Sequence, residues 1–191
     1  MPKRRRVAPR RPNPNLKKIR QGLSYVLYDR ETPAGAAEDF SMFSTPKGTS
    51  GKTFKDTNML VAGQLPAAHE FDIQAIGFTI LGAAGIPPTH DVLATFLTNL
   101  YMELNINSRP QLQLPGPALP LINQMAEDQV SDATGIGISI SSLPRSVLKL
   151  TEPLHIGKGE NFDMQLVSAD TALTGFIYAY LFGKLYRPGL A

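Results

Sequence analysis

The residues of this chain that are best suited to chemistry are the basic residues of its first twenty positions. The segment MPKRRRVAPRRPNPNLKKIR carries nine of the nineteen Lys and Arg residues and no acidic residue. The rest of the chain has ten basic and sixteen acidic residues, a net charge of −6. A cationic arm on an acidic body indicates a polyanionic partner for the arm. The residues that we assign to phosphate contact are Lys3, Arg4, Arg5, Arg6, Arg10, Arg11, Lys17, Lys18 and Arg20.

We expect this arm, residues 1–20, to be disordered, because its four prolines disfavour regular structure and it has few apolar residues to bury. Charges spaced along a flexible chain suit neutralisation of phosphates with release of counterions. No aromatic residue lies among them, so base stacking is not available there and binding should be independent of sequence. Residues 2–7, PKRRRV, also have the composition of a nuclear-import segment, a role compatible with nucleic-acid binding.

A second candidate is Gly51-Lys52-Thr53, which is the end of a phosphate-binding loop motif. The complete motif requires a glycine where this chain has Pro46, and a helix after the motif to offer its backbone amides to the phosphate. Here the following residues lead into predicted strand structure. We therefore favour a polar loop over a nucleotide site.

Metal and enzyme chemistry find little support. The three histidines, His69, His90 and His155, lie far apart without metal-site spacing, and no cysteine is present. The carboxylates occur in small groups that lack the six to eight oxygens of a calcium site, and we interpret them as solvated charge. These groups are Glu38-Asp39, Glu127-Asp128, and Glu160 with Asp163. We predict no enzyme activity, no cofactor, no metal and no small-molecule substrate.

The elements that must carry the arm are predicted to be mostly β-strands in one domain, residues 21–191. The longest nearly apolar run, 75–86, is too short for a membrane helix. Short runs of alternating or β-prone residues, separated by turn signals, indicate about eight strands of an antiparallel sandwich or barrel. The runs are 25–28, 59–65, 71–80, 101–107, 111–115, 136–140, 148–156, 162–166 and 175–185.

Several local features interrupt this pattern. A polar loop is expected over 31–55, and a change of apolar phase within 71–80 predicts a bulge or burial on both faces. Residues 89–100 place Val92, Leu93, Phe96, Leu97 and Leu100 on one helical face, with Thr89 as a cap, and a second short helix is expected over 121–127.

Some apolar residues lie in the predicted loops. Phe40, Met42 and Phe43, and the stretch 86–88, are more apolar than a solvated loop requires. They would either dock on neighbouring subunits or cover the bottom of the protein's own core. The sequence leaves both interpretations open.

The body resembles the single jelly-roll major capsid proteins of small tailless icosahedral viruses, phage-like ones included. The resemblance rests on loose patterns over most of residues 56–188. Its early part is Asp56-Thr57-Asn58-Met59, Gly63-Gln64-Leu65-Pro66 and Phe71-x-Ile73-x-Ala75-Ile76. Its C-terminal part is Pro153-Leu154-x-Ile156, Phe162-x-Met164-x-Leu166 and Leu181-x-Gly183-x-Leu185-x-Arg187-Pro188.

This resemblance implies an all-β, eight-stranded antiparallel jelly-roll sandwich with one inserted helix and a basic arm. It implies self-assembly into an icosahedral shell, with the arm on the packaged genome, DNA or RNA, and other capsid proteins as further partners. The expected location is the virion, and also the host nucleus if residues 2–7 act as an import signal.

Two other classes of protein remain as alternatives. The first is a nucleic-acid-binding or chaperone-like β-sandwich that forms no shell. The second is a sugar-binding or cupin-like sandwich, which the absence of tryptophan and of clustered histidines disfavours.

Overall fold

The computed structural model describes residues 21–33, 39–82, 85, 88, 90–122, 147–168 and 175–187. Most of them lie in strands, as the alternating sequence pattern predicts. In chain order the elements are β1 (Gln21–Glu31), β2 (Asp39–Met42), β3 (Glu70–Gly82), α1 (His90–Thr98), β4 (Leu100–Ile106), β5 (Arg109–Pro115), the 3-10 helix η1 (Gly116–Ala118), β6 (Leu148–Ile156), β7 (Phe162–Ser168) and β8 (Gly175–Arg187).

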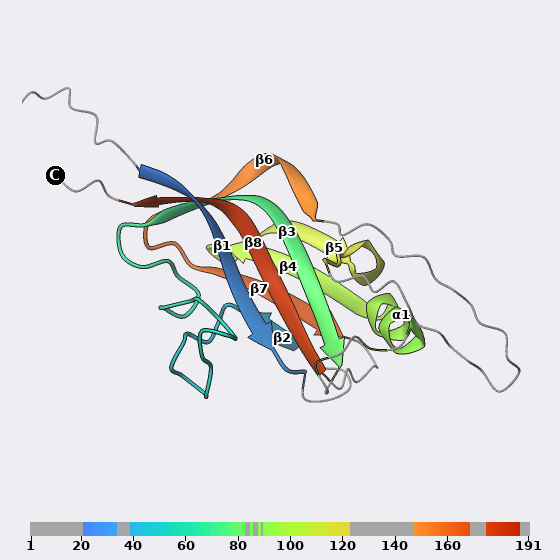
Figure 1. The fold of residues 1–191 in the computed structure, drawn as a ribbon. Coiled ribbons are helices and arrows are strands. Elements are labelled where there is room, and N and C mark those ends of the chain that lie inside the picture. The colour runs from blue at the N-terminus through green and yellow to red at the C-terminus, as the bar shows by residue number, and fades with distance from the viewer. Residues whose placement is uncertain are drawn as a thin grey trace, which may run out of the picture.

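The strands form two antiparallel sheets of four (Figure 1). The first sheet has the order β1-β8-β3-β6 and the second the order β2-β7-β4-β5. Across both sheets β1 pairs with β8, β2 with β7, β3 with β6 and β4 with β5. The strands are therefore paired like the two halves of one long hairpin, β1–β4 against β5–β8, and successive pairs alternate between the two sheets.

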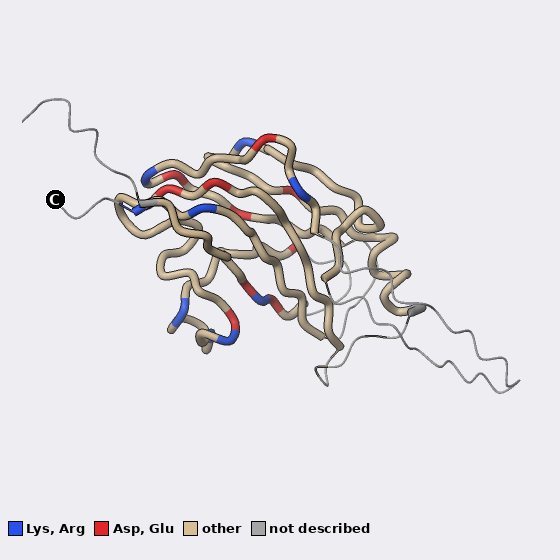
Figure 2. Tube along the Cα trace, turned by 45° about the horizontal axis from the view of Figure 1, so that its top comes forward, with Lys and Arg blue, Asp and Glu red and all other residues tan. Residues whose placement is uncertain are grey.

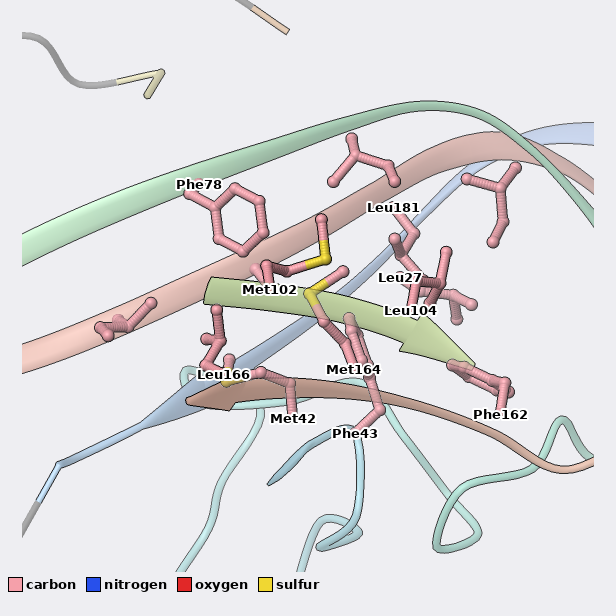
Figure 3. Packing of buried hydrophobic residues seen from close by; sticks show 14 of the residues in the cluster. Leu27, Met42, Phe43, Phe78, Met102, Leu104, Phe162, Met164, Leu166 and Leu181 are labelled. Atoms are coloured by element: carbon pink, nitrogen blue, oxygen red, sulfur yellow. The ribbon is translucent and has the colours of Figure 1, made fainter. Parts of the chain in front are cut away.

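One hydrophobic core lies between the sheets. Phe78 and Leu181 point into it from the first sheet, and Met102, Met164 and Leu166 from the second (Figure 3). All five are fully buried. In β7 and β8 buried residues alternate with more exposed ones, so one face of each sheet is removed from water. The arrangement is a two-layer, sandwich-like β fold.

The helix α1 lies between β3 and β4 in the chain, and it covers one end of the two layers (Figure 1). Phe96 is buried, and Leu93 and Leu97 pack against the core. The prediction of a helix over 89–100 is confirmed for its central part. Val92, which we predicted on the same helical face as Phe96, is 45% exposed, and Leu100 begins the next strand.

The predicted bulge in β3 is confirmed. Its register shifts between Ile73 and Ala75 against both of its neighbours. Gly183 of β8 lies opposite Ile73, and a Cβ atom at this glycine would come within 1.9 Å of the Asp72 carbonyl oxygen. Only a residue without a side chain permits this close approach of the two backbones.

Two predictions about the segment before β3 are wrong. A strand, β2, lies inside the predicted loop 31–55, and the predicted strand 59–65 is a loop with isolated bridges. In that loop Met59 and Leu65 are buried while Leu60 and Val61 face outward, which breaks the alternation of a strand. Gly63 adopts a φ of +58°, which extended strands do not use.

Several predicted features lie outside the described residues. These are the arm 1–20, the cap Thr89, residues 123–127 of the second predicted helix and the strand 136–140.

Candidate functional site

All nine basic residues that we assigned to phosphate contact lie outside the described residues, which begin where the arm meets the body. The chain enters β1 at Gln21, which pairs with Arg187 near the end of β8. These two chain ends lie side by side in Figure 1. The exposed Lys184 lies three residues earlier on β8. The arm therefore joins the body at an end of the first sheet that has basic residues of its own.

Elsewhere in the described part of the chain, basic and acidic residues are interspersed (Figure 2). The densest group of charged residues joins β1 to residues 43–65, which follow β2 in the chain. We call residues 43–65 the β1 loop because they are attached to β1. Lys52 Nζ lies 2.8 Å from Asp29 Oδ1 and also pairs with Glu31 Oε1. Asp29 is fully buried, so a single lysine of the loop compensates a carboxylate that has been removed from water.

The same carboxylate holds the start of the β1 loop. Asp29 Oδ2 accepts a hydrogen bond of 2.5 Å from the Phe43 backbone N–H. Phe43 is fully buried and has a φ of +66°, an uncommon conformation for a bulky residue. The Phe43 carbonyl accepts a hydrogen bond from Gly63 N–H at 2.9 Å. A strained backbone position is thus fixed from both sides.

Burial raises the pKa of Asp29 and Glu31, and this effect outweighs the opposing effect of Lys52 on both groups. Asp56 behaves differently. Burial alone would raise its pKa, but hydrogen bonds from the Thr53 N–H and hydroxyl, followed by the charge of Arg30, hold it below its ordinary value. Arg30 Nη2 lies 2.8 Å from Asp56 Oδ1. The β1 loop is therefore attached to β1 by two ion-pair groups of different pH dependence.

The β1 loop also covers the edge of the first sheet. Asn58 accepts a hydrogen bond from Tyr28 N–H at 3.0 Å and donates one to the Val26 carbonyl at 2.7 Å. The Thr57 hydroxyl donates to the Tyr28 carbonyl at 3.2 Å. An uncovered edge strand invites pairing with another chain. Here loop side chains occupy the edge instead.

This geometry bears directly on the phosphate-loop fragment. Lys52, the lysine of Gly51-Lys52-Thr53, is bound to two carboxylates of β1. The fragment therefore acts as an anchor of the loop in this structure. Sequence reasoning missed this role because 21 to 23 residues separate Lys52 from its partners.

The β1 loop carries three outward-facing apolar residues. Phe54, Leu60 and Val61 are 63%, 58% and 40% exposed. Lys47 Nζ lies 3.5 Å from the centre of the Phe54 ring. In contrast, Met42 and Phe43 are fully buried and Phe40 packs against the core, so these three follow the core interpretation. Leu60 and Val61 belong to the segment 59–65 that we predicted as a strand, whereas Phe54 belongs to the predicted loop 31–55.

Among the described side chains, His69 and His155 make separate contacts. His155 Nδ1 lies 2.7 Å from Asp72 Oδ1, and its other ring nitrogen lies 3.9 Å from Glu70, which also contacts Lys158. His69 bonds to the Pro66 carbonyl within a turn. Among the described residues no group of three His, Asp or Glu side chains could hold a metal ion. No helix in the same residues is long and apolar enough to cross a membrane.

The sequence matches no protein-family model, and no curated protein is significantly similar to it.

Proposed function

We propose that this chain is a coat protein that assembles into a closed icosahedral shell and binds the packaged genome through its basic arm. The proposal combines a shell-forming body with a tail for nucleic acid. It rests on the order of strand pairing, on the charge of the arm and on the apolar surface of the β1 loop.

The pairing order supports a jelly roll. A long antiparallel hairpin, wound so that its successive strand pairs alternate between two sheets, gives the pairs β1·β8, β2·β7, β3·β6 and β4·β5. Eight strands in two sheets with such connections are typical of viral capsid domains and of some lectins and cupins. Because one fold serves many functions, pairing order alone does not identify a coat protein.

The observation that carries the proposal is therefore the arm. Twenty residues with a net charge of +9 immediately precede β1 of this body. Such a segment neutralises phosphates without reading sequence, which suits a packaged DNA or RNA. The proposed contacts are made by Lys3, Arg4, Arg5, Arg6, Arg10, Arg11, Lys17, Lys18 and Arg20.

The apolar residues of the β1 loop suit contacts between subunits. Phe54 and Leu60 are more than half exposed, although the loop that carries them is firmly attached to β1. A rigid loop with exposed apolar side chains loses little entropy when a second subunit covers it. In a closed shell the same surface would recur at every equivalent contact.

The proposal places the protein in the virion, with copies of itself, the genome and other capsid proteins as partners. Segment 2–7 would in addition direct the protein to the host nucleus during assembly.

The test is negative-stain electron microscopy of the purified full chain over a range of salt and pH. Closed particles of uniform diameter are expected. A matched variant, with the nine arm residues changed to Gln, should still form particles because the body makes the subunit contacts. A wild-type chain that stays monomeric while binding nucleic acid through its arm would instead indicate a binding module that forms no shell.

A further inference from the structure

The outer face of β8 carries aromatic side chains at successive outward positions. Its inward residues, among them Ile177, Ala179 and Leu181, are buried in the core. The alternate residues Phe176, Tyr178, Tyr180 and Phe182 are partly exposed. We call these four residues the aromatic row. The core does not require aromatic residues on the opposite face of this strand.

The rings of the row stand side by side. The ring centroids of Tyr178 and Tyr180 are 6.2 Å apart, and the two ring planes make an angle of 9°. The ring centroids of Tyr180 and Phe182 are 6.1 Å apart, and their planes make an angle of 27°. The Arg30 guanidinium lies 4.6 Å from the centre of the Phe176 ring. Tyr178, Tyr180 and Phe182 therefore form an ordered strip of three stacked rings, and Phe176 at the end of the row lies against a cation.

On the β3 side the row borders small residues that other side chains cover. Across the register Tyr180 faces Gly77 of β3, and Phe182 faces Ala75. Both are buried. A Cβ atom at Gly77 would come within 2.5 Å of the Ile122 side chain and 3.3 Å of the Val147 side chain, so these two side chains lie over β3 beside Tyr180 and bound the row on that side. In Figure 1 β1, β8 and β3 lie side by side, and α1 lies beyond their end.

The charges nearby favour a nucleic acid as the occupant. Lys184 is the next outward position of β8 after the row, and Arg187, at the end of the strand, pairs with Gln21, where the arm joins the body. Two acidic residues of β3 also lie here. Asp72 is opposite Lys184 and pairs with His155, and Glu70 is opposite Tyr186 and contacts His155 and Lys158. The arm supplies nine cations and no aromatic residue, whereas the row supplies aromatic rings.

Single strands present unpaired bases that stack on aromatic side chains, whereas a duplex keeps its bases paired inside. We propose that the aromatic row stacks the bases of a single-stranded nucleic acid whose phosphates are neutralised by the arm. This inference rests on the nucleic-acid part of the proposed function. It adds a second binding element and a preference for single strands, which the arm alone would not give.

The test compares single-stranded and duplex oligonucleotides of the same sequence, titrated onto the full chain by fluorescence anisotropy. The variant is Tyr178→Leu with Tyr180→Leu, which keeps apolar bulk on the strand. The control is Tyr101→Leu, because Tyr101 is a 37% exposed tyrosine on β4 of the other sheet. The double variant should bind the single strand at least roughly five-fold more weakly. Its duplex affinity and its salt dependence should match the wild type.

A second measurement needs no variant. The chain has six tyrosines and no tryptophan, so its ultraviolet emission reports tyrosine alone. Stacking predicts quenching of this emission by the single strand and much less by the duplex. Equal quenching by both, or unchanged single-strand affinity in a folded double variant, would overturn the inference.

Further outcomes separate this inference from the proposed function. If the wild type binds single strands and duplexes equally and forms particles, the row is not a base platform but the coat-protein proposal stands. If the double variant loses particles and keeps its single-strand affinity, the row is a contact between copies of the chain, which also overturns the inference. If no particles form but the double variant binds single strands more weakly, the shell proposal fails and this inference is supported.

Discussion

Lys52 of the β1 loop lies 2.8 Å from the buried carboxylate of Asp29 on β1, and this contact joins a long loop to the edge of the first sheet. Asp29 also accepts the N–H of Phe43, where the loop begins. One carboxylate thus holds two points of the loop. The position of the exposed Phe54, which we assign to subunit contact, depends on this anchor.

Changing Lys52 to Met should destabilise the fold, because it leaves the carboxylates of Asp29 and Glu31 without their cation. Removing one partner of a buried ion pair costs about 3 kcal/mol or more of unfolding free energy. Urea denaturation of the two proteins measures the difference. Lys55→Met is the matched control, since Lys55 is exposed on the same loop, and it should stay within about 0.5 kcal/mol of wild type. Equal losses in the two variants would contradict the anchor.

Asp56 should stabilise the fold in a pH-dependent way. Its folded pKa lies below the ordinary value of 3.8, so its contribution is present above that pH and is lost as the pH falls through the folded pKa. Asp56→Asn should therefore cost about 1 kcal/mol at pH 7, and less and less below pH 3.8. Urea midpoints from pH 3 to 7 measure this, with Asp39→Asn as the exposed control. A cost that stays constant across the range would refute the role of the charge.

The apolar surface of the β1 loop should drive association. Phe54→Ser with Leu60→Ser should weaken assembly about ten-fold or more, because buried aromatic residues dominate interface energies. The stability of the isolated chain should change little, since both side chains face outward. Sedimentation velocity over a concentration series measures association. Val92→Ser, at a 45% exposed position on α1, is the control, and an equal effect there would argue against a specific contact through the loop.

The arm should make binding strongly dependent on salt. Nine phosphate contacts predict a slope of log K against log salt of about −6 for single strands. Changing Arg4, Arg5 and Arg6 to Gln should reduce the magnitude of this slope by about 2. Titrations at several salt concentrations measure it. An unchanged slope would place the phosphate contacts elsewhere on the chain.

The sequence predicted the strands that alternate cleanly. In β4 and β7 one face is apolar and the other polar, so the burial of Met102 and Met164 follows directly from the pattern. The bulge in β3 was visible as a change of phase. The aromatic row has the same period of two along β8, so its signal was present, but a sequence does not show which face of a strand is outward.

Long-range relationships could not be predicted. The four residues of β2 are too few for a periodic pattern, and their pairing with β7 joins residues more than 120 positions apart. Residues 59–65 have the apolar content of a strand, but Met59 and Leu65 are buried as single anchors of a loop. The partners of Lys52 were hidden for the same reason, because both carboxylates lie on β1, 21 to 23 residues before the lysine in the chain.

The most direct test of the central claim is to sediment purified particles after nuclease treatment and to record their absorbance at 260 and 280 nm. The account predicts fast-sedimenting wild-type particles that retain protected nucleic acid. The variant with all nine arm residues changed to Gln should give particles without it. Wild-type material that sediments only as monomers, or neutralised particles that retain as much nucleic acid as the wild type, would contradict it.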